Sequence, residues 1–159
     1  MSLNLRLCTL RDVEIIYNIS NDPKVRKNSL NIDEISYENH IKWYKDSLIN
    51  ANRIMYVIQD KHVIVGQIRL DKQDDRAIIS YSIEKNSRNK GYGSKALNLI
   101  KSEALKNNIS TIEGVVKKDN IASKAAFKKN GFLEIEEQNY FRYIYSIKDG
   151  DNTEINKDR

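Results

Sequence analysis

Residues 88–93 read Arg-Asn-Lys-Gly-Tyr-Gly and lie between a β-branched apolar run, 77–83, and an amphipathic segment, 94–106. Glycine has no Cβ, so the two glycines allow a sharp turn and a close approach of the backbone to a ligand. The N–H groups of a first helical turn lack partners within the helix and are backed by the helix dipole. The stretch therefore predicts a strand, a turn that binds a pyrophosphate, and a helix, unless the glycines only shape the turn. Arg88 and Lys90 add positive charge there.

A second motif follows another strand-like run, 111–116, and reads Asn-Ile-Ala-Ser-Lys-Ala-Ala-Phe-Lys-Lys-Asn-Gly-Phe over 120–132. Asn120 is suited to cap a helix, and Gly131 is suited to end it. The apolar inner face expected for this helix consists of Ile121, Ala125 and Phe127. One such capped helix is common, but the two motifs in this order are far more specific.

Together the motifs resemble those of the GNAT superfamily of acyl-CoA-dependent N-acyltransferases, over roughly residues 4–146. The resemblance implies acetyl-CoA as the cofactor. It also implies that the first motif holds the coenzyme A pyrophosphate, and that the second motif's Asn and aromatic residue flank the pantetheine arm and thiol. The implied coenzyme-binding residues are Ser82, Ile83, Arg88, Asn89, Lys90, Gly91, Tyr92, Gly93, Ser94, Asn120, Ser123 and Phe127.

The fold class expected is α/β (α+β), with one GNAT-like domain over 4–147 and a frayed polar tail over 148–159. Apolar periodicity and turn residues predict the order β-α-α-β-β-β-α-β-α-β-β. This order gives a mixed, mostly antiparallel sheet of about seven strands with helices on both faces. The strands are expected at 4–7, 53–59, 62–70, 77–83, 111–116, 133–137 and 140–147, the helices at 9–20, 36–50, 94–106 and 120–131, and a loop at 25–35.

The composition excludes several classes of protein. The chain has 159 residues, of which 40% are hydrophobic and 31% charged, as in a globular domain. Its charge of +5 is interspersed with acidic residues, so a polyanionic cofactor explains it and we expect no nucleic-acid partner. There is neither a long apolar run nor a signal-peptide pattern, which predicts a cytoplasmic protein with no membrane partner. With one cysteine, Cys8, and two histidines we expect no disulfide and no metal site. A homodimer is left open.

Acetyl transfer needs a neutral amine, a polarised carbonyl and an acceptable leaving thiolate. The resemblance implies that backbone amides of Tyr81 to Ile83 hold the carbonyl oxygen, which makes Tyr81 a catalytic candidate. One branch of the family has a glutamate at a position that is Ala77 here. The nearest carboxylate is Glu84, which is either a base or a solvated residue at the strand end. His40 is the other candidate, either catalytic or structural.

The usual general acid is also replaced. Many members of the family carry a tyrosine four residues before the glycine of the second motif, where this chain has Phe127. A phenyl ring has no proton to donate, so the thiolate leaves unassisted or another hydroxyl serves. Tyr92, Tyr140 and Tyr143 are the alternatives.

The first third of the chain resembles a GNAT branch that acetylates nucleotide-linked deoxyaminosugars in the pseudaminic-acid pathway. The matching stretches are 18–26, 38–43 and 66–69, although that branch often has Arg where this chain has Ser20. The expected substrate-binding residues are Arg26 and Arg69 for a nucleotide diphosphate, Trp43 for a sugar or base face, and His40 for the pocket wall.

Other functions are left open by the sequence. They are acetylation of a ribosomal-protein type N-terminus, acetylation of a polyamine or aminoglycoside, for which Asp33, Glu34 and Glu38 could form an acidic pocket, and a non-catalytic acyl-CoA sensor.

Overall fold

The computed structural model describes residues 2–147. The expected tail, 148–159, lies outside the described residues. The strands are β1 (Leu3–Leu7), β2 (Arg53–Asp60), β3 (Val63–Gln73), β4 (Arg76–Ile83), β5 (Thr111–Lys117), β6 (Leu133–Glu136) and β7 (Tyr140–Ser146). The α-helices are α1 (Val13–Ser20), α2 (Pro23–Asn28), α3 (Tyr37–Leu48), α4 (Tyr92–Lys106) and α5 (Ile121–Lys129), and short 3-10 turns are η1 (Leu10–Asp12) and η2 (Lys85–Ser87).

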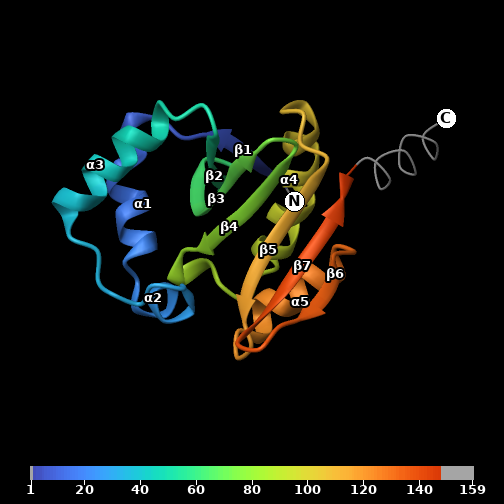
Figure 1. Ribbon diagram of the computed structural model, residues 1–159. Coiled ribbons are helices and arrows are strands. Elements are labelled where there is room, and N and C mark those ends of the chain that lie inside the picture. Colours follow the sequence, from blue (N-terminus) through green and yellow to red (C-terminus); the bar gives the residue numbers. More distant parts are fainter. Residues whose placement is uncertain (1, 148–159) are drawn as a thin grey trace.

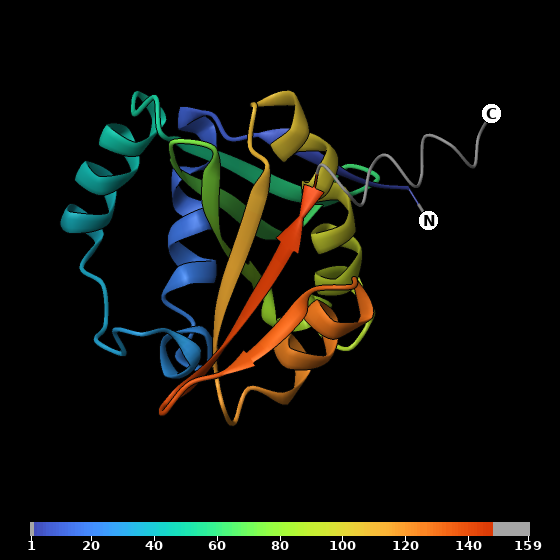
Figure 2. The same cartoon turned by 45° about the vertical axis from the view of Figure 1, so that its right-hand side comes forward.

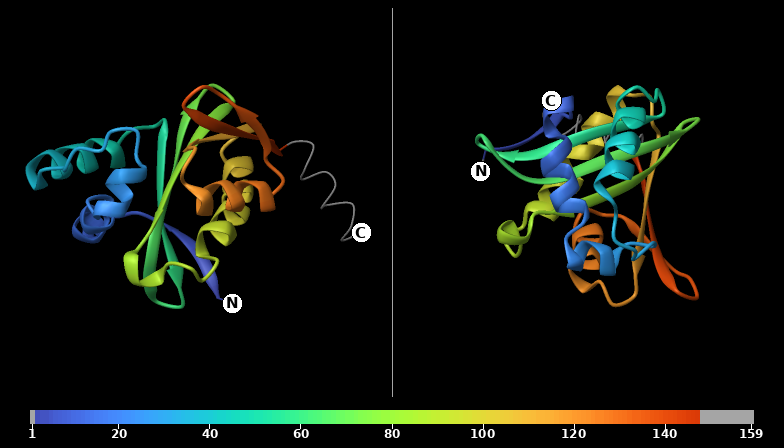
Figure 3. Two further views of the ribbon diagram at one scale, coloured as in Figure 1. Left: turned by 90° about the horizontal axis from the view of Figure 1, so that it is seen from below. Right: turned by 90° about the vertical axis from the view of Figure 1, so that its left-hand side faces the viewer.

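The strands form one seven-stranded sheet in the order β1-β2-β3-β4-β5-β7-β6. Neighbours are antiparallel except for β4 and β5, which are parallel. Helices α1, α2 and α3 lie on one side of the sheet, and α4 and α5 lie on the other (Figures 1 and 3). The predicted fold class, a mixed and mostly antiparallel sheet between helices, is confirmed.

The side chains of β4 show how the sheet separates the two layers. Ala77 and Ile79 are buried against Leu97 and Ile100 of α4, and Tyr81 and Ile83 pack at the border of the same core. Successive strand residues point to opposite faces, so Ser80 and Ser82 point toward the α1–α2 layer. A smaller core of Ile16, Tyr44, Met55 and Val57 holds α1 and α3 on that layer.

Strands β4 and β5 pair only at their first residues, where Arg76 to Ile78 lie opposite Thr111 to Glu113. Beyond this point they diverge, as Figure 1 shows in green and yellow-orange. On its other side β4 remains paired with β3 up to Ile83, and the Glu84 amide donates to Val65 O at 2.8 Å. Because the amides of a strand alternate in direction, those of Tyr81 and Ile83 face the open gap.

Two local expectations were wrong. Residues 25–28 of the expected loop, 25–35, belong to helix α2, because Asp22 accepts a hydrogen bond from Lys24 N as N-cap and Pro23 occupies the first turn. In α5, Phe127 is buried as expected, but Ile121 is 75% exposed, Ala125 is exposed as well, and Ala126 is the second buried residue. The helix is rotated relative to the expected stripe, since its first residue points away from the sheet.

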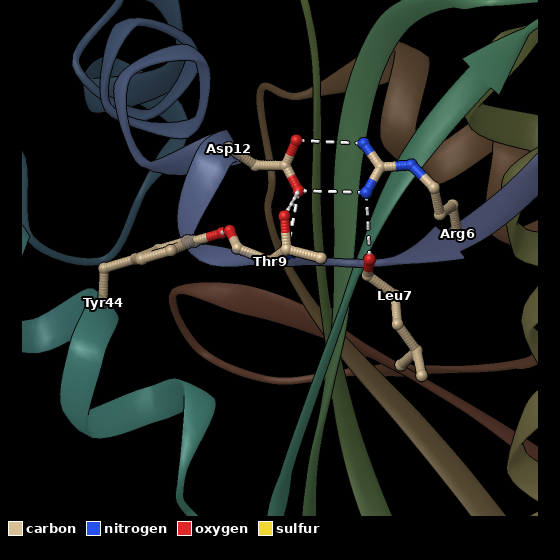
Figure 4. A network of polar contacts seen from close by, with 5 residues as sticks. All are labelled: Arg6, Leu7, Thr9, Asp12 and Tyr44. Atoms are coloured by element: carbon tan, nitrogen blue, oxygen red, sulfur yellow. Dashed lines mark hydrogen bonds and ion pairs between the residues drawn. The ribbon is translucent and has the colours of Figure 1, made fainter.

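A polar network joins β1 to α1 and α3 (Figure 4). Arg6 donates to both carboxylate oxygens of Asp12, at 2.9 and 3.1 Å, and the Thr9 amide donates to Asp12 at 2.8 Å. Burial alone would raise the pKa of Asp12, but these hydrogen bonds outweigh it and the pKa is lowered. Tyr44 donates its hydroxyl proton to Thr9 O. Nearby, burial raises the pKa of the Cys8 thiol to about 12, which suits a structural thiol.

Candidate active site

The gap between β4 and β5 opens into a cavity of about 770 Å³. Its walls come from both layers of the molecule. From the α4–α5 layer they include Tyr81, Ile83, Gly91, Tyr92, Gly93, Ser94, Asn120, Ser123 and Phe127, and from the α1–α2 layer Ser20, Lys24, Arg26, Ser29, Gln67, Arg69, Ser80 and Ser82. The cavity therefore passes through the sheet where it is split, and Figure 2 shows β4 and β5 from the side of this split.

The turn before α4 forms the anion-binding end. Gly91 has φ +81°, a left-handed conformation that favours glycine, and a Cβ there would find no atom within 4 Å. The first bond within the helix runs from Lys95 N to Gly91 O, at 3.2 Å. The amides of residues 92–94 thus precede the hydrogen-bonded turns and point outward from a 15-residue helix. This fits a diphosphate.

Gly93 is favoured for a different reason, because a Cβ on it would lie 3.0 Å from the Tyr81 ring, which is a tighter contact than usual. Asn89 also has a positive φ, 63°, and lines the cavity, whereas Lys90 is exposed and is not among the lining residues. Arg88 lines the cavity and forms an ion pair with Asp22 at 2.7 Å. The hydrogen bond from Arg88 lowers the pKa of Asp22, so this contact ties the turn to α2.

Helix α5 forms the wall opposite β4. Asn120 caps the helix by accepting from Ser123 N at 3.3 Å, and Ser123 Oγ accepts from the Tyr81 hydroxyl at 2.9 Å. Phe127 is 2% exposed and stacks on Tyr143 with ring centroids 5.1 Å apart. A Cβ on Gly114 would lie 2.2 Å from the Phe127 ring, so a glycine is needed beneath it.

Arg26 lies in the wall on the α1–α2 layer, with most of its donors bound to protein. It donates to Ser20 O at 2.8 Å, to Ser29 Oγ at 3.1 Å, and to the carbonyls of Asn31 and Asp33 at 3.1 and 3.3 Å. Burial lowers its pKa from the ordinary value. Arg26 therefore shapes the segment after α2, and its guanidinium is less available to a ligand than expected.

Arg69 also lines the cavity, and its Nε donates to Asp71 at 3.1 Å. Its guanidinium carbon lies 5.2 Å from the centroid of the Trp43 ring, and that of Arg53 lies 5.3 Å from it. Trp43 is not among the residues that line the cavity. Its ring is in contact with guanidinium groups, so it supports Arg69 instead of presenting a face to a sugar.

The two side chains expected as bases lie away from the cavity. Glu84 accepts hydrogen bonds from Asn86 N at 2.9 Å and Ser87 Oγ at 3.3 Å, and thus caps η2. His40 is 2% exposed within the α1–α3 layer, where its Nε2 lies 3.0 Å from Val13 O. Burial lowers the pKa of His40, which favours the neutral ring. The side chain belongs to the buried face of α3, a placement that the mixed polarity of that helix did not reveal.

Of the tyrosines considered as the acid, Tyr92 donates its hydroxyl proton to Asp60 and Tyr143 donates to Glu134 at 2.7 Å. Neither Tyr140 nor Tyr143 lines the cavity. The end of the cavity on the α1–α2 layer, lined by Ser20, Gln67 and Arg69, is called the acceptor end below. Sequence reasoning missed Ser20 and Gln67, whose side chains hydrogen-bond to each other there at 2.7 Å. Their signal was present, because both belong to the stretches 18–26 and 66–69.

Within residues 2–147 no cluster of His, Cys, Asp and Glu is suited to a metal ion. Among the same residues, no helix has the length and apolar character needed to span a bilayer.

Comparisons with known proteins agree with this geometry. Residues 2–133 match the family model described as an acetyltransferase (GNAT) domain. An uncharacterized N-acetyltransferase from Bacillus licheniformis is 27% identical over 157 residues, which cover 89% of this chain and 88% of the relative.

Solved structures share the fold at low identity. Spermidine N-acetyltransferase from Vibrio cholerae, in complex with CoA and spermine, has a TM-score of 0.86 at 16% identity and covers 92% of this chain and 96% of its own. A ribosomal-protein α-N-acetyltransferase in complex with coenzyme A has a TM-score of 0.80 at 16% identity, covering 92% and 94%. The family model spans most of the chain, so the chain belongs to the GNAT family and is an N-acetyltransferase whose cofactor is acetyl-CoA.

Proposed function

We propose that the protein acetylates the primary amine of an acceptor molecule that also carries negatively charged groups. The preferred acceptor is a nucleotide-linked deoxyaminosugar. The observation that carries this proposal is the charge of the cavity wall. Lys24, Arg26, Arg69, Arg88 and Lys129 line it, whereas no Asp or Glu of the described residues does. Arg69 and Arg88 are balanced in part by Asp71 and Asp22, which do not line the cavity, so the wall keeps an excess of positive charge that attracts anions and repels polycations.

The acceptor end is suited to a diphosphate for a further reason. Arg69 lines the cavity while only its Nε is paired with Asp71, so the terminal guanidinium nitrogens are oriented by that contact. Planar guanidinium groups bind phosphate through paired donors. Nearby, Gln67 and Ser20 offer amide and hydroxyl groups of the kind that bind sugar hydroxyls. Of the stretches that resemble the aminosugar branch, 18–26 and 66–69 meet at this end.

The chemistry requires little from side chains. Acetyl-CoA supplies an activated acyl group, and the amides of Tyr81 and Ile83 face the gap where its carbonyl oxygen would be held. The cavity holds the two reactants close together, which is itself worth several kcal/mol. With no carboxylate among the described lining residues, we infer that water in the cavity takes the proton of the amine.

Spermidine and protein N-termini are the acceptors named for the structural neighbours, and both are alternatives here. The wall argues against a polyamine, because Asp33, Glu34 and Glu38 are exposed outside the cavity. A basic peptide N-terminus would meet the same repulsion. A sensor that binds acyl-CoA without turnover is the remaining alternative.

Thiol release from acetyl-CoA tests the proposal. The amines are a UDP-linked 4-amino sugar, spermidine, kanamycin and an N-terminal peptide, each at the same concentration. We expect turnover with the nucleotide sugar and little with the cationic amines. Faster turnover of spermidine than of the nucleotide sugar would contradict the proposal, and coenzyme binding without any thiol release would favour the sensor.

A further inference from the structure

We propose that Tyr81 is the general acid that protonates the departing sulfur, in place of the tyrosine that Phe127 replaces. The inference concerns acetyl transfer itself and does not depend on which amine is the acceptor.

Tyr81 and Tyr92 are the tyrosines among the described residues that line the cavity. The Tyr92 hydroxyl donates to Asp60, at the end of β2. The Tyr81 side chain instead crosses from β4 to α5, where its hydroxyl lies 2.9 Å from Ser123 Oγ. Its ring centroid lies 6.0 Å from that of Phe127, one helical turn beyond Ser123. The Tyr81 ring thus packs beside the Phe127 ring, which lacks a hydroxyl, and its own hydroxyl lies against the same helix.

The amides of residues 92–94 would hold the diphosphate of acetyl-CoA, and the Tyr81 and Ile83 amides would hold its carbonyl oxygen in the gap. The arm joining these two groups would then lie along β4 on the α4–α5 layer, with its sulfur near Tyr81. Tyr81 points into that same layer, because it packs against Phe127 and lies 3.0 Å from a Cβ built on Gly93.

The step delivers one proton to the sulfur. As the carbon–sulfur bond of the thioester breaks, the O–H bond of Tyr81 breaks and an S–H bond forms. The attacking nitrogen loses a proton to cavity water, and this proton returns to the phenolate, so Tyr81 ends as it began. For this step the hydroxyl hydrogen turns from Ser123 Oγ to the sulfur, because a tyrosine hydroxyl can reorient its hydrogen between two acceptors.

The surroundings of Tyr81 suit a proton donor. Burial raises its pKa, so the hydroxyl stays protonated throughout the neutral pH range. Ser123 Oγ accepts the hydrogen bond from the Tyr81 hydroxyl in the absence of a better acceptor, and a developing thiolate is a better one.

The variant Tyr81→Phe keeps the ring that packs on Gly93 and Phe127, and removes only the hydroxyl. We expect kcat to fall about 100-fold, as for the loss of a general acid, with an unchanged Kd for coenzyme A. A donor that stabilises a thiolate lowers the pKa of the thiol. We therefore expect the pKa of bound coenzyme A to rise by about one unit in the variant, measured from thiolate ultraviolet absorbance during a pH titration.

Tyr56→Phe is the matched control. Its hydroxyl donates to Glu103 at 3.2 Å, and Tyr56 does not line the cavity. We expect this variant to leave both kcat and the pKa of the bound thiol unchanged. A bound thiol with the same pKa in Tyr81→Phe and in the unmodified protein would overturn the proposal, whatever happens to kcat.

Ser123→Ala gives a second test if Tyr81→Phe fails to fold. Removing the resting acceptor leaves the Tyr81 donor in place, so the pKa of the bound thiol should stay level or fall. If that pKa rises in Ser123→Ala, the sulfur is protonated by Ser123 and the assignment to Tyr81 is wrong.

Discussion

The coenzyme side of the cavity is formed largely by the main chain, whereas the acceptor side is formed by side chains. On the first side, the residues that matter are glycines and helix-capping groups, namely Gly91, Gly93 and Asn120. On the second side, Gln67, Arg69 and the segment after α2 are held by side-chain contacts. A site made of main-chain amides can be damaged only by a change of backbone or charge, whereas one made of side chains can be altered one group at a time.

The largest effect is expected from Gly91→Glu. A carboxylate at this position faces the bound diphosphate, and the positive φ of +81° adds backbone strain of about 1–2 kcal/mol. We expect coenzyme A affinity to fall at least about 100-fold by calorimetry, a loss of roughly 3 kcal/mol. The circular-dichroism spectrum should remain folded, because a Cβ at position 91 meets open space.

Gly131→Glu is the control for that variant. Gly131 has a similar φ, +79°, and does not line the cavity, so strain and charge are matched. Equal loss of coenzyme affinity in the two variants would show that the effect is global and would remove the support for a diphosphate site at Gly91.

The next effect concerns the acceptor side alone. Arg69→Gln should raise KM for an anionic acceptor about 10- to 100-fold, the value of a lost charged hydrogen bond, with the Kd of coenzyme A unchanged. Arg53→Gln is the control, because Arg53 contacts the same Trp43 and Asp71 without lining the cavity. If Arg53→Gln raises KM as much as Arg69→Gln does, Arg69 is not a ligand of the acceptor.

Asp22→Asn probes the contact between the two sides. Asparagine still caps α2, but the ion pair with Arg88 is lost. We expect the loss of this ion pair to cost about 1 kcal/mol of binding free energy, seen as a few-fold weaker affinity for coenzyme A and a few-fold higher KM for the acceptor. An effect limited to one of these two quantities would mean that the two sides do not communicate through this pair.

The smallest effect is on stability and lies outside the cavity. The pKa of His40 is lowered from 6.5, so the folded protein binds this proton less readily than the unfolded chain does. The contribution of neutral His40 is therefore complete above about pH 6.5 and is lost as the pH falls through the lower, folded-state pKa. We expect His40→Gln to remove up to about 1 kcal/mol of the acid sensitivity measured by urea unfolding at neutral and mildly acidic pH. The exposed His62→Gln should leave that sensitivity unchanged, and an equal effect in the two variants would refute the assignment.

This contrast also explains how much the sequence could predict. The succession of strands and of the longer helices along the chain, the turn at 88–93 and the cap at Asn120 depend on local residue types, and they were predictable. Helix α2 was missed because its start depends on the single pair Asp22 and Pro23 within a polar segment. His40 was assigned to the pocket because periodicity does not show which edge of α3 turns toward α1.

The position of Glu84 depends on the geometry of a turn, and the position of Trp43 depends on contacts with distant parts of the chain. Glu84 is held by the turn that follows it, and Trp43 by guanidinium groups from β2 and β3. Tyr81 was named for its backbone amide, and its side chain became visible as a candidate only once α5 was placed across the gap.

A crystal structure of the protein soaked in coenzyme A tests the central claim most directly. If the cavity connects the two layers through the split sheet, the diphosphate should lie against the amides of residues 92–94, with the pantetheine arm between β4 and β5. Density for the coenzyme outside this gap, or a gap closed by protein in its presence, would contradict the account.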